Sequence, residues 1–368
     1  MSGGKKPHVL HVITGLEVGG AEAMLVKTLP KLTGYEHTVC TVLNDGPLAA
    51  PLREAGIRVV NLQAGSKGLW QAVRGFRLLA KEKPDLMISY LIHADLFTRF
   101  LAPLFGIKRR VAFIRNNLIG SKYHKLLLME RWTQWLVQSY FSVSQSVADM
   151  YVEKLGYPRK KFTVIANGIE EKPFLSAQPL SKKELGLSEK DVAVLMVGKF
   201  FAQKGHTYLI EAWPQVLEKF PQARLLLAGG GPLEQEIKGM VTAADLDNSV
   251  RFLGVRSDVP RLLKTCDVFV FPTLFEGMSN ALLEAMISEC AIVTTDIPEN
   301  REVATEEEVV FVPSRNATAL AQALNQTLQD EKMRKEMGKK ARARVERDFI
   351  VSRTVATLNA AYERSLTL

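Results

Sequence analysis

Two glutamates in the segment 271–286 are spaced in a way that suits binding of a polar ligand. Glu276 and Glu284 are separated by seven residues. Four residues form the turn directly after the first of them: Gly277, Met278, Ser279 and Asn280. Residues 267–271 form an apolar run that predicts a strand, and Ser279 or Asn280 can act as the N-cap of a helix that begins after the turn.

A helix that begins at this turn would hold both carboxylates close to its N-terminus. Free amide groups at a helix N-terminus attract anions, and Glu284 would follow the cap by one turn, ~6 Å along the axis. Phosphates could then lie at the cap while Glu284 accepts hydrogen bonds from a diol and Glu276 faces another group of the same ligand. The segment therefore predicts a sugar-nucleotide site. The structural alternative is a surface loop followed by a glutamate in a first helical turn, where glutamate is common.

Lysines and glycines follow other apolar runs of the chain. Lys199 and Lys204 come after the run 191–197 and precede a helical period. Two ammonium groups at this place would stabilise the charge that develops on a departing diphosphate, and solvated loop lysines are the alternative. Gly19 and Gly20 follow the first apolar run, where their missing side chains would let a phosphate or a sugar approach the backbone. A tight turn between a strand and a helix is the alternative for these glycines.

Five short motifs occur in a fixed order along the chain. They are Gly19-Gly20-Ala21-Glu22, then Val164 to Ile169 (Val-Ile-Ala-Asn-Gly-Ile), Val197-Gly198-Lys199-Phe200 with Gln203-Lys204-Gly205-His206, Leu226 to Leu233 (Leu-Leu-Ala-Gly-Gly-Gly-Pro-Leu), and the segment from Glu276 to Met286. In this order they resemble the motifs of the retaining GT-B glycosyltransferases of family 4, and the resemblance covers most of the chain. It implies an α/β fold with two Rossmann-like, doubly wound domains that face each other across a cleft.

The resemblance also implies a reaction. The expected reaction is transfer of a hexose or N-acetylhexosamine from a nucleoside-diphosphate sugar, with a UDP-sugar favoured, to a glycan or lipid-linked acceptor with retention of configuration. Such enzymes build cell-surface polysaccharide or lipopolysaccharide. A sugar-nucleotide epimerase or hydrolase of the same fold, and a non-catalytic adaptor at a membrane surface, are the alternative functions.

The resemblance assigns roles to single residues. Glu284 would hold the ribose diol and Glu276 the sugar hydroxyls, so that neither acts as a nucleophile. Lys199 and Lys204 would carry the diphosphate charge, although the family usually has Arg at the first of these positions, which orients a phosphate more firmly. His93 matches the family's active-site histidine near the donor sugar, and a histidine that caps the following helix is the alternative.

The N-terminal part of the chain is basic. Residues 1–170 contain 23 Lys and Arg against 12 Asp and Glu, a net charge of +11, whereas the remainder carries −2. Basic and aromatic residues alternate in 106–141, and five residues there are expected to face the acceptor or a membrane: Arg115, Lys122, Lys125, Trp132 and Trp135. A basic amphipathic helix with aromatic residues is typical of an anionic membrane surface; a structural helix with a solvated face is the alternative. No nucleic-acid-binding pattern is present, so nucleic acid is not expected as a partner.

Composition limits the cofactors and the compartment. The pattern Asp245-Leu246-Asp247 follows a helical period and is expected to be a solvated helix end, so no metal and no cofactor beyond the nucleotide sugar is expected. The three cysteines are widely spaced, which favours buried free thiols. The chain has no run of 18 apolar residues and no apolar signal region, which predicts a cytoplasmic protein, either free or peripheral on the inner face of the membrane.

Periodicity predicts two similar domains. Apolar runs at 8–13, 38–43, 58–62, 86–89 and 111–114 alternate with helical periods from about 21 and at 48–55, 69–82 and 94–104. This alternation predicts a mostly parallel sheet. The polar stretch 170–183 predicts an inter-domain linker, after which runs at 191–197, 223–228, 249–253, 267–271 and 291–295 predict a second sheet. We therefore expect one domain at 1–170 and another at 171–349. The resemblance implies that the first binds the acceptor and the second the donor, and that a last helix, 350–368, crosses back to the first; a terminal helix without such a role is the alternative.

Overall fold

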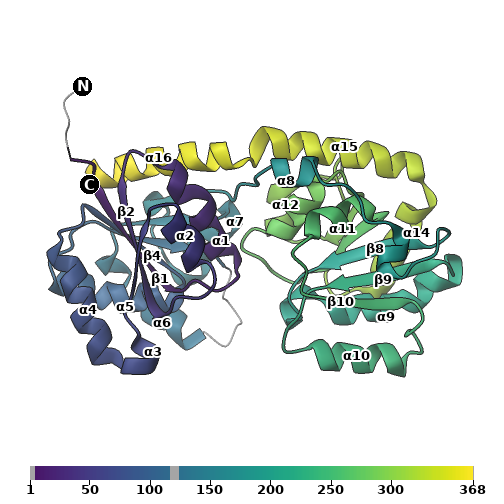
Figure 1. Cartoon of the computed structure of the whole chain (residues 1–368), viewed down its shortest axis with the longest axis horizontal. Coiled ribbons are helices and arrows are strands. Elements are labelled where there is room, and N and C mark those ends of the chain that lie inside the picture. Colours follow the sequence, from purple (N-terminus) through teal and green to yellow (C-terminus); the bar gives the residue numbers. More distant parts are fainter. Residues whose placement is uncertain (1–4, 117–123, 368) are drawn as a thin grey trace. The chain divides into compact units, whose positions relative to one another are not determined.

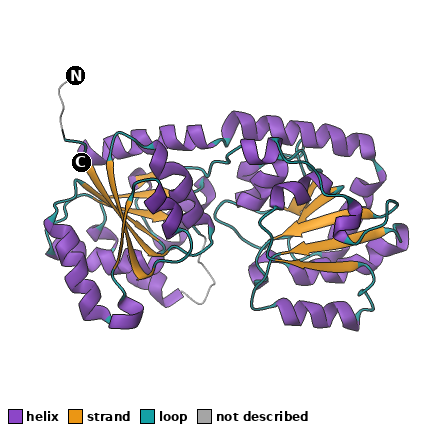
Figure 2. Cartoon of the chain, viewed as in Figure 1, coloured by secondary structure: helices purple, strands orange, loops and turns teal. Residues whose placement is uncertain are grey.

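The structure is a computed structural model that describes residues 5–116 and 124–367. It divides into two compact units, of which the first comprises Met1–Gly168 and Val351–Leu368 and the second Ile169–Ile350 (Figure 1). The boundaries expected from the sequence, after residue 170 and before residue 350, lie within two residues of the observed ones. Each unit contains one parallel sheet that is covered by helices (Figure 2). The chain therefore has the α/β architecture that the alternation of runs predicts.

The first sheet has seven strands in the order β3-β2-β1-β4-β5-β6-β7. Their bounds are β1 (His8–Gly15), β2 (Glu36–Asn44), β3 (Arg58–Asn61), β4 (Leu86–Tyr90), β5 (Arg110–Ile114), β6 (Ser139–Ser142) and β7 (Phe162–Val164). All neighbouring strands in it are parallel. The sequence pattern does not predict β6 and β7, because β6 begins and ends with serine and β7 has three residues with a threonine at its centre, so neither forms an apolar run.

The helices of the first unit connect these strands. They are α1 (Gly20–Thr28), α2 (Ala49–Glu54), α3 (Ala64–Lys67), α4 (Leu69–Lys81), α5 (Ile92–Leu104), α6 (His124–Trp132), α7 (Gln145–Leu155) and the C-terminal α16 (Val351–Thr367). The last of these, drawn in yellow, packs against α1 and β4 of the same unit (Figure 1). The strand order reverses between β1 and β4, and ligands of open α/β sheets bind at such a reversal.

Helix α5 begins earlier than predicted. The pattern places His93 in front of the helix, whereas α5 begins at Ile92 and His93 is its second residue. The N-cap is Leu91, which makes no side-chain cap hydrogen bond and has a backbone φ of 66°. The alternative role of His93 as a helix cap is therefore wrong.

The second sheet has six strands in the order β10-β9-β8-β11-β12-β13. Their bounds are β8 (Val192–Val197), β9 (Ala223–Ala228), β10 (Val250–Gly254), β11 (Val268–Phe271), β12 (Ile292–Thr295) and β13 (Val310–Val312). The helices are α8 (Lys172–Leu175), α9 (His206–Lys219), α10 (Glu234–Ala243), α11 (Val259–Thr265), α12 (Asn280–Ile287), α13 (Pro298–Val303), α14 (Ala317–Gln329) and α15 (Glu331–Asp348). All strand pairs are again parallel, and the order reverses between β8 and β11.

The stretch 170–183 is not a free linker. It belongs to the second unit and contains the short helix α8. Phe174 and Leu180 are buried, and the amide of Leu180 donates a 2.8 Å hydrogen bond to the hydroxyl of Thr265. The two prolines and the polar residues of this stretch hide these two apolar anchors from a pattern-based prediction.

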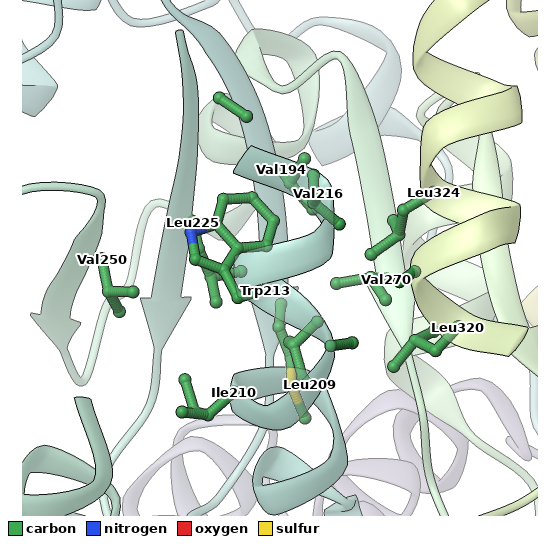
Figure 3. Packing of buried hydrophobic residues seen from close by; sticks show 14 of the residues in the cluster. Val194, Leu209, Ile210, Trp213, Val216, Leu225, Val250, Val270, Leu320 and Leu324 are labelled. Atoms are coloured by element: carbon green, nitrogen blue, oxygen red, sulfur yellow. The ribbon is translucent and has the colours of Figure 1, made fainter. Parts of the chain in front are cut away.

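A large core holds β8 and β11 in place. Trp213 of α9 is fully buried between Val194 of β8 and Leu225 of β9, and its indole nitrogen donates a 3.1 Å hydrogen bond to Ser249 (Figure 3). Burial of one such side chain contributes about 2 to 3 kcal/mol. This core also includes Val270 of β11 and so holds β8, β9 and β11 in place.

Among the described residues, no helix is both long and apolar enough to cross a bilayer.

Candidate active site

The predicted site residues of the second unit gather at the reversal of its sheet. Lys199 follows β8 by two residues, and Glu276 follows β11 by five. Because these strands are neighbours and parallel, their carboxyl ends open on the same edge. This is the place where open α/β sheets bind ligands.

A glycine brings the two loops into contact. The loop after β8 contains a short 3₁₀ helix, Ala202–Lys204, and ends at Gly205 with a φ of 71°. A Cβ atom on Gly205 would lie 2.0 Å from the carbonyl oxygen of Pro272. Only glycine therefore permits this close approach in a left-handed conformation.

Hydrogen bonds connect the loops side by side. The carbonyl oxygen of Gln203 accepts from the amide of Leu274 at 2.7 Å, and the Gln203 side-chain amide donates to the carbonyl oxygen of Phe275 at 2.6 Å. Lys204 Nζ donates to Glu276 Oε1 at 2.6 Å. The loop after β8 therefore has a fixed position relative to the loop after β11.

The Lys204–Glu276 ion pair is largely buried. The Lys204 side chain is 18% exposed and that of Glu276 is 8% exposed. The Thr273 hydroxyl donates to the same Glu276 oxygen at 2.8 Å, and Lys204 Nζ lies 5.0 Å from the centre of the Phe271 ring. The resemblance implies separate partners for these residues, a phosphate for the lysine and sugar hydroxyls for the glutamate. In the structure the two side chains bind each other.

Helix α12 begins at the predicted turn. Ser279 is its N-cap and accepts a 3.3 Å hydrogen bond from the amide of Leu282, and Asn280 is the first helical residue. Gly277 and Met278 are buried in front of the cap. Glu284 lies one turn further on and is partly exposed. The arrangement of cap and carboxylate that the spacing predicts is therefore present.

The glycines after β9 have a packing role. Gly229 has a φ of 146°, and a Cβ atom there would lie 1.9 Å from the carbonyl oxygen of Gly198. A Cβ atom on Gly231 would lie 2.8 Å from the backbone of Phe200. These glycines allow the loops after β8 and β9 to touch, next to the exposed Lys199.

A buried histidine adjoins the ion pair. His206 packs on the ring of Phe200 with 4.5 Å between ring centroids. Burial, together with the positive charge of Lys204, lowers the pKa of His206 to about 4. The histidine is therefore neutral at pH 7 and adds no charge to the site. Three contributors were not singled out by the sequence pattern as site residues: Gln203, Thr273 and His206.

In the first unit the predicted residues lie around the β1/β4 reversal. Gly19 is the N-cap of α1, and a Cβ atom there would lie 2.4 Å from a carboxylate oxygen of Glu22. This close contact is a structural reason for glycine at position 19, in line with the alternative of a tight turn between a strand and a helix. Gly20, the next residue, is exposed. His93 is exposed and lines a cavity of about 320 Å³ together with Leu91 and Arg115.

A buried ionic cluster forms one wall of this cavity. Arg99 donates to Asp95 at 2.7 Å and to Glu130 at 3.4 Å, and Ser89 donates to Asp95 at 2.7 Å. Burial and the neighbouring Asp95 raise the pKa of Glu130 well above its usual value. The cluster joins α5 to α6. The sequence pattern did not single it out, because Ser89, Asp95 and Arg99 lie 31 to 41 residues before Glu130 in the chain.

The predicted surface tryptophans face outward. The exposed fractions of Trp132 and Trp135 are 80% and 74%, and Lys125 is exposed as well. Lys122, predicted at the same surface, lies outside the described residues.

Within the described part of the chain, no three His, Cys, Asp or Glu side chains are arranged to hold a metal ion.

Comparison with protein families matches both units. Residues 18–172 match the family described as "Glycosyltransferase Family 4", and residues 177–344 match "Glycosyl transferases group 1". An Escherichia coli protein named UDP-Gal:alpha-D-GlcNAc-diphosphoundecaprenol alpha-1,3-galactosyltransferase is 26% identical over 78% of this chain and 77% of its own. A Campylobacter jejuni protein named N-acetylgalactosamine-N,N'-diacetylbacillosaminyl-diphospho-undecaprenol 4-alpha-N-acetylgalactosaminyltransferase is 24% identical over 90% of this chain and 93% of its own.

Solved structures share the fold. The Anabaena protein HepE, in complex with UDP and glucose, superposes with a TM-score of 0.86 at 20% identity, over 97% of this chain and all of its own. WaaG, a glycosyltransferase involved in lipopolysaccharide biosynthesis, superposes with a TM-score of 0.74 at 16% identity, over 94% of this chain and 97% of its own. These neighbours and the two parallel sheets identify the fold as GT-B.

Proposed function

Because the chain belongs to the group 1, family 4 glycosyltransferases, we propose that it moves a hexose or N-acetylhexosamine from a UDP-sugar to a glycan or lipid-linked acceptor with retention. The observation that carries the proposal is the convergence of Lys199, the Lys204–Glu276 pair and the start of α12 at the reversal of the second sheet. These groups supply cations, helix amides and carboxylates for one anionic, hydroxyl-rich ligand. Assembly of cell-surface polysaccharide or lipopolysaccharide is the process in which such a transfer takes part.

In the proposed reaction the leaving phosphate does the work of a base. A β-phosphate oxygen accepts the proton of the acceptor hydroxyl while that hydroxyl attacks the same face of the sugar. Lys199, Lys204 and the amides at Ser279 and Asn280 stabilise the charge that grows on the diphosphate. Residues of this chain supply that charge stabilisation without a metal. The first unit binds the acceptor near His93 and Arg115.

The ion pair must open when the donor binds. Lys204 can turn to the diphosphate only by leaving Glu276, which is then free to accept hydrogen bonds from the sugar. Thr273 donates to Glu276 at 2.8 Å and would hold the carboxylate in place during this exchange. The pair thus keeps both charges satisfied until the donor replaces each partner, because an unpaired buried charge is unfavourable.

A UDP-sugar is favoured over other donors because HepE binds UDP and glucose with the same fold and the Escherichia coli relative's name begins with UDP-Gal. The test is a thermal-shift scan of UDP-, GDP- and ADP-sugars, since a ligand at 100 times its Kd adds about 2.7 kcal/mol of stability. A transfer assay then follows the best donor with and without lipid-linked acceptors. Stabilisation by no nucleotide sugar would contradict the proposal. Turnover of the donor that does not depend on any acceptor would instead indicate an epimerase or a hydrolase.

Two substitutions separate donor binding from chemistry. Lys204→Ala should lower kcat about a hundredfold, roughly 3 kcal/mol, because phosphate charge increases as the bond breaks. Glu284→Gln should mainly raise the Kd for donor, because a ribose contact is equally present before and during the reaction. Steady-state kinetics together with calorimetric UDP binding measures both effects. Turnover of Lys204→Ala at the unsubstituted rate would exclude the lysine from the site.

Attachment to an anionic membrane is part of the proposal. Phe100 and Leu104 of α5 are exposed, as are Leu128, Met129 and Trp132 of the adjoining α6. Basic side chains near these apolar ones in the chain are exposed too: Lys125 and Arg131 of α6, and Lys108 in the loop after α5. Apolar side chains beside basic ones suit the interface of a bilayer that contains acidic lipids. Such attachment would place the first unit next to a lipid-linked acceptor.

A further inference from the structure

Arg115 is a buried cation without a buried anion. Its side chain follows β5, and the residue is only 9% exposed. Nη2 donates to Asn167 Oδ1 at 2.6 Å and to the carbonyl oxygen of Gly20 at 3.3 Å, and the guanidinium lies 4.9 Å from the centre of the Phe113 ring. All of these partners are neutral. Nε is buried without a hydrogen-bond acceptor among the described residues.

Another buried arginine of the same unit shows the usual arrangement. Arg99 is 1% exposed and has two carboxylates, Asp95 and Glu130, within ion-pair distance. Among the residues that the structure describes, no carboxylate lies within that distance of Arg115. Burial lowers the pKa of Arg115, and Glu22 on α1, which acts on Arg115 electrostatically, raises that pKa by a smaller amount. Residues 117–123, which follow closely in the chain, contain no Asp or Glu.

A buried charge without a counter-ion is unfavourable. Burial lowers the pKa of Arg115 to about 10, which still leaves the guanidinium charged at pH 7. The protein therefore keeps a cation in a place where folding alone would favour a neutral side chain. Ionisable groups perturbed by burial cluster at functional sites, where an incoming ligand can supply the missing charge.

The surroundings of Arg115 fit a ligand site. It lines the cavity of about 320 Å³ at the β1/β4 reversal, together with His93 and Tyr151. Leu91, in the same wall, has a φ of 66°, which a bulky side chain rarely adopts. Asp95 and Glu130 also line the cavity, and Arg99 forms an ion pair with each of them. The remaining wall is mainly apolar, including Ile92 and Phe113, so among the described residues the cation that an anion in the cavity would meet without an ion-pair partner is Arg115.

We propose that Arg115 is the anchor in this cavity for an anionic group of the acceptor, either a phosphate or a sugar carboxylate. The guanidinium provides at least one free N–H group, on Nε, and both oxyanions match its planar donors. This inference rests on the proposed function in that it takes the first unit to bind the acceptor. It adds that the acceptor must be negatively charged near the reacting sugar.

The test first removes the phosphate affinity of the second unit. In the full chain with Lys199→Ala and Lys204→Ala, inorganic pyrophosphate, glucuronate and neutral N-acetylglucosamine are titrated by calorimetry and thermal shift. We expect pyrophosphate or glucuronate to bind, and Arg115→Gln in this background to weaken that binding at least tenfold. Arg115→Lys should restore part of it. Arg74→Gln, which removes an exposed charge on α4 of the same unit, is the control and should change nothing.

The relative affinities of pyrophosphate and glucuronate show which acidic group of the acceptor the site binds. Tighter pyrophosphate binding assigns the site to a phosphate of the acceptor, and tighter glucuronate binding assigns it to an acidic sugar. Absence of binding of either anion to the Lys199→Ala, Lys204→Ala protein would overturn the inference, and this arm does not depend on whether Arg115→Gln folds. Equal anion binding with and without Arg115 would overturn it as well.

A kinetic measurement separates this inference from the proposed function. In the otherwise unchanged enzyme, Arg115→Gln should raise KM for a phosphate-bearing acceptor at least tenfold while the Kd for UDP stays within twofold. A parallel loss of UDP affinity would place Arg115 on the donor diphosphate and overturn the acceptor assignment. Failure of the unsubstituted protein to bind any nucleotide sugar would instead refute the proposed function and leave the anion titration to decide on Arg115 alone.

Discussion

Glu276→Gln should have opposite effects on UDP and on a UDP-sugar. In the structure Lys204 Nζ lies 2.6 Å from Glu276 Oε1. At that distance the gross attraction in a partly buried environment is about 6 kcal/mol for an effective dielectric constant of 20, and desolvation offsets most of it. A net coupling of about 1 to 2 kcal/mol remains, within the range measured for residues in contact.

Loss of this coupling frees Lys204 for phosphate. Glutamine keeps the shape and an oxygen that can accept from Thr273, but it removes the charge that competes with the diphosphate. UDP should therefore bind about tenfold more tightly, which corresponds to 1.4 kcal/mol. The donor sugar loses a charged hydrogen bond of about 2 kcal/mol, which exceeds the gain at the diphosphate by about 0.6 kcal/mol, so kcat/KM for the UDP-sugar should decrease about threefold.

Calorimetry with UDP and steady-state kinetics with the sugar nucleotide measure the two effects on the same protein. Glu234→Gln is a matched control, because Glu234 pairs with Lys238 at 2.8 Å on the exposed helix α10 of the same unit. This variant should leave UDP affinity unchanged. Weaker UDP binding by Glu276→Gln would refute the competition between the carboxylate and the diphosphate. Unchanged kcat/KM would refute the sugar contact.

Three further predictions concern metal, membrane and pH. EDTA should leave transfer activity unchanged, because lysines and helix amides carry the diphosphate charge; loss of activity that Mg²⁺ restores would contradict this. The variant with Trp132→Ser and Trp135→Ser should lose most of its co-sedimentation with anionic vesicles. The control Trp70→Ser, which alters a tryptophan that is 83% exposed on α4, should still co-sediment. Vesicle binding that changes neither with salt nor with the loss of Trp132 and Trp135 would count against a membrane surface. The free energy of unfolding should decrease by about 3 kcal/mol more between pH 7 and pH 4 in the unsubstituted protein than in His206→Gln. The sign follows because burial lowers the folded-state pKa of His206 to about 4, so the unfolded chain binds the extra proton as pH falls below about 6.5; equal pH dependence in urea titrations of both proteins would refute it.

Features that depend on neighbours in the chain are predicted well from the sequence. The strand before Glu276, the cap at Ser279 and the position of Glu284 one turn later follow from local periodicity and capping preferences, and the structure has them in place. The two parallel sheets also follow from the alternation of runs. Local signals fail where they are short or disguised, as in β6 and β7 and in the stretch 170–183.

Contacts between distant segments are decided by the tertiary structure. Lys204 and Glu276 are 72 residues apart and meet because β8 and β11 are neighbours, a pairing that depends on the order of strands and on the close approach at Gly205. Arg115 reaches Asn167 over 52 residues, and its lack of an anion becomes visible only when every surrounding element is in place. The periodicity of a sequence predicts which side of a strand or helix is apolar. Whether a charge is buried, and which group is its partner, depend on which residues of the other elements lie next to it in the folded chain.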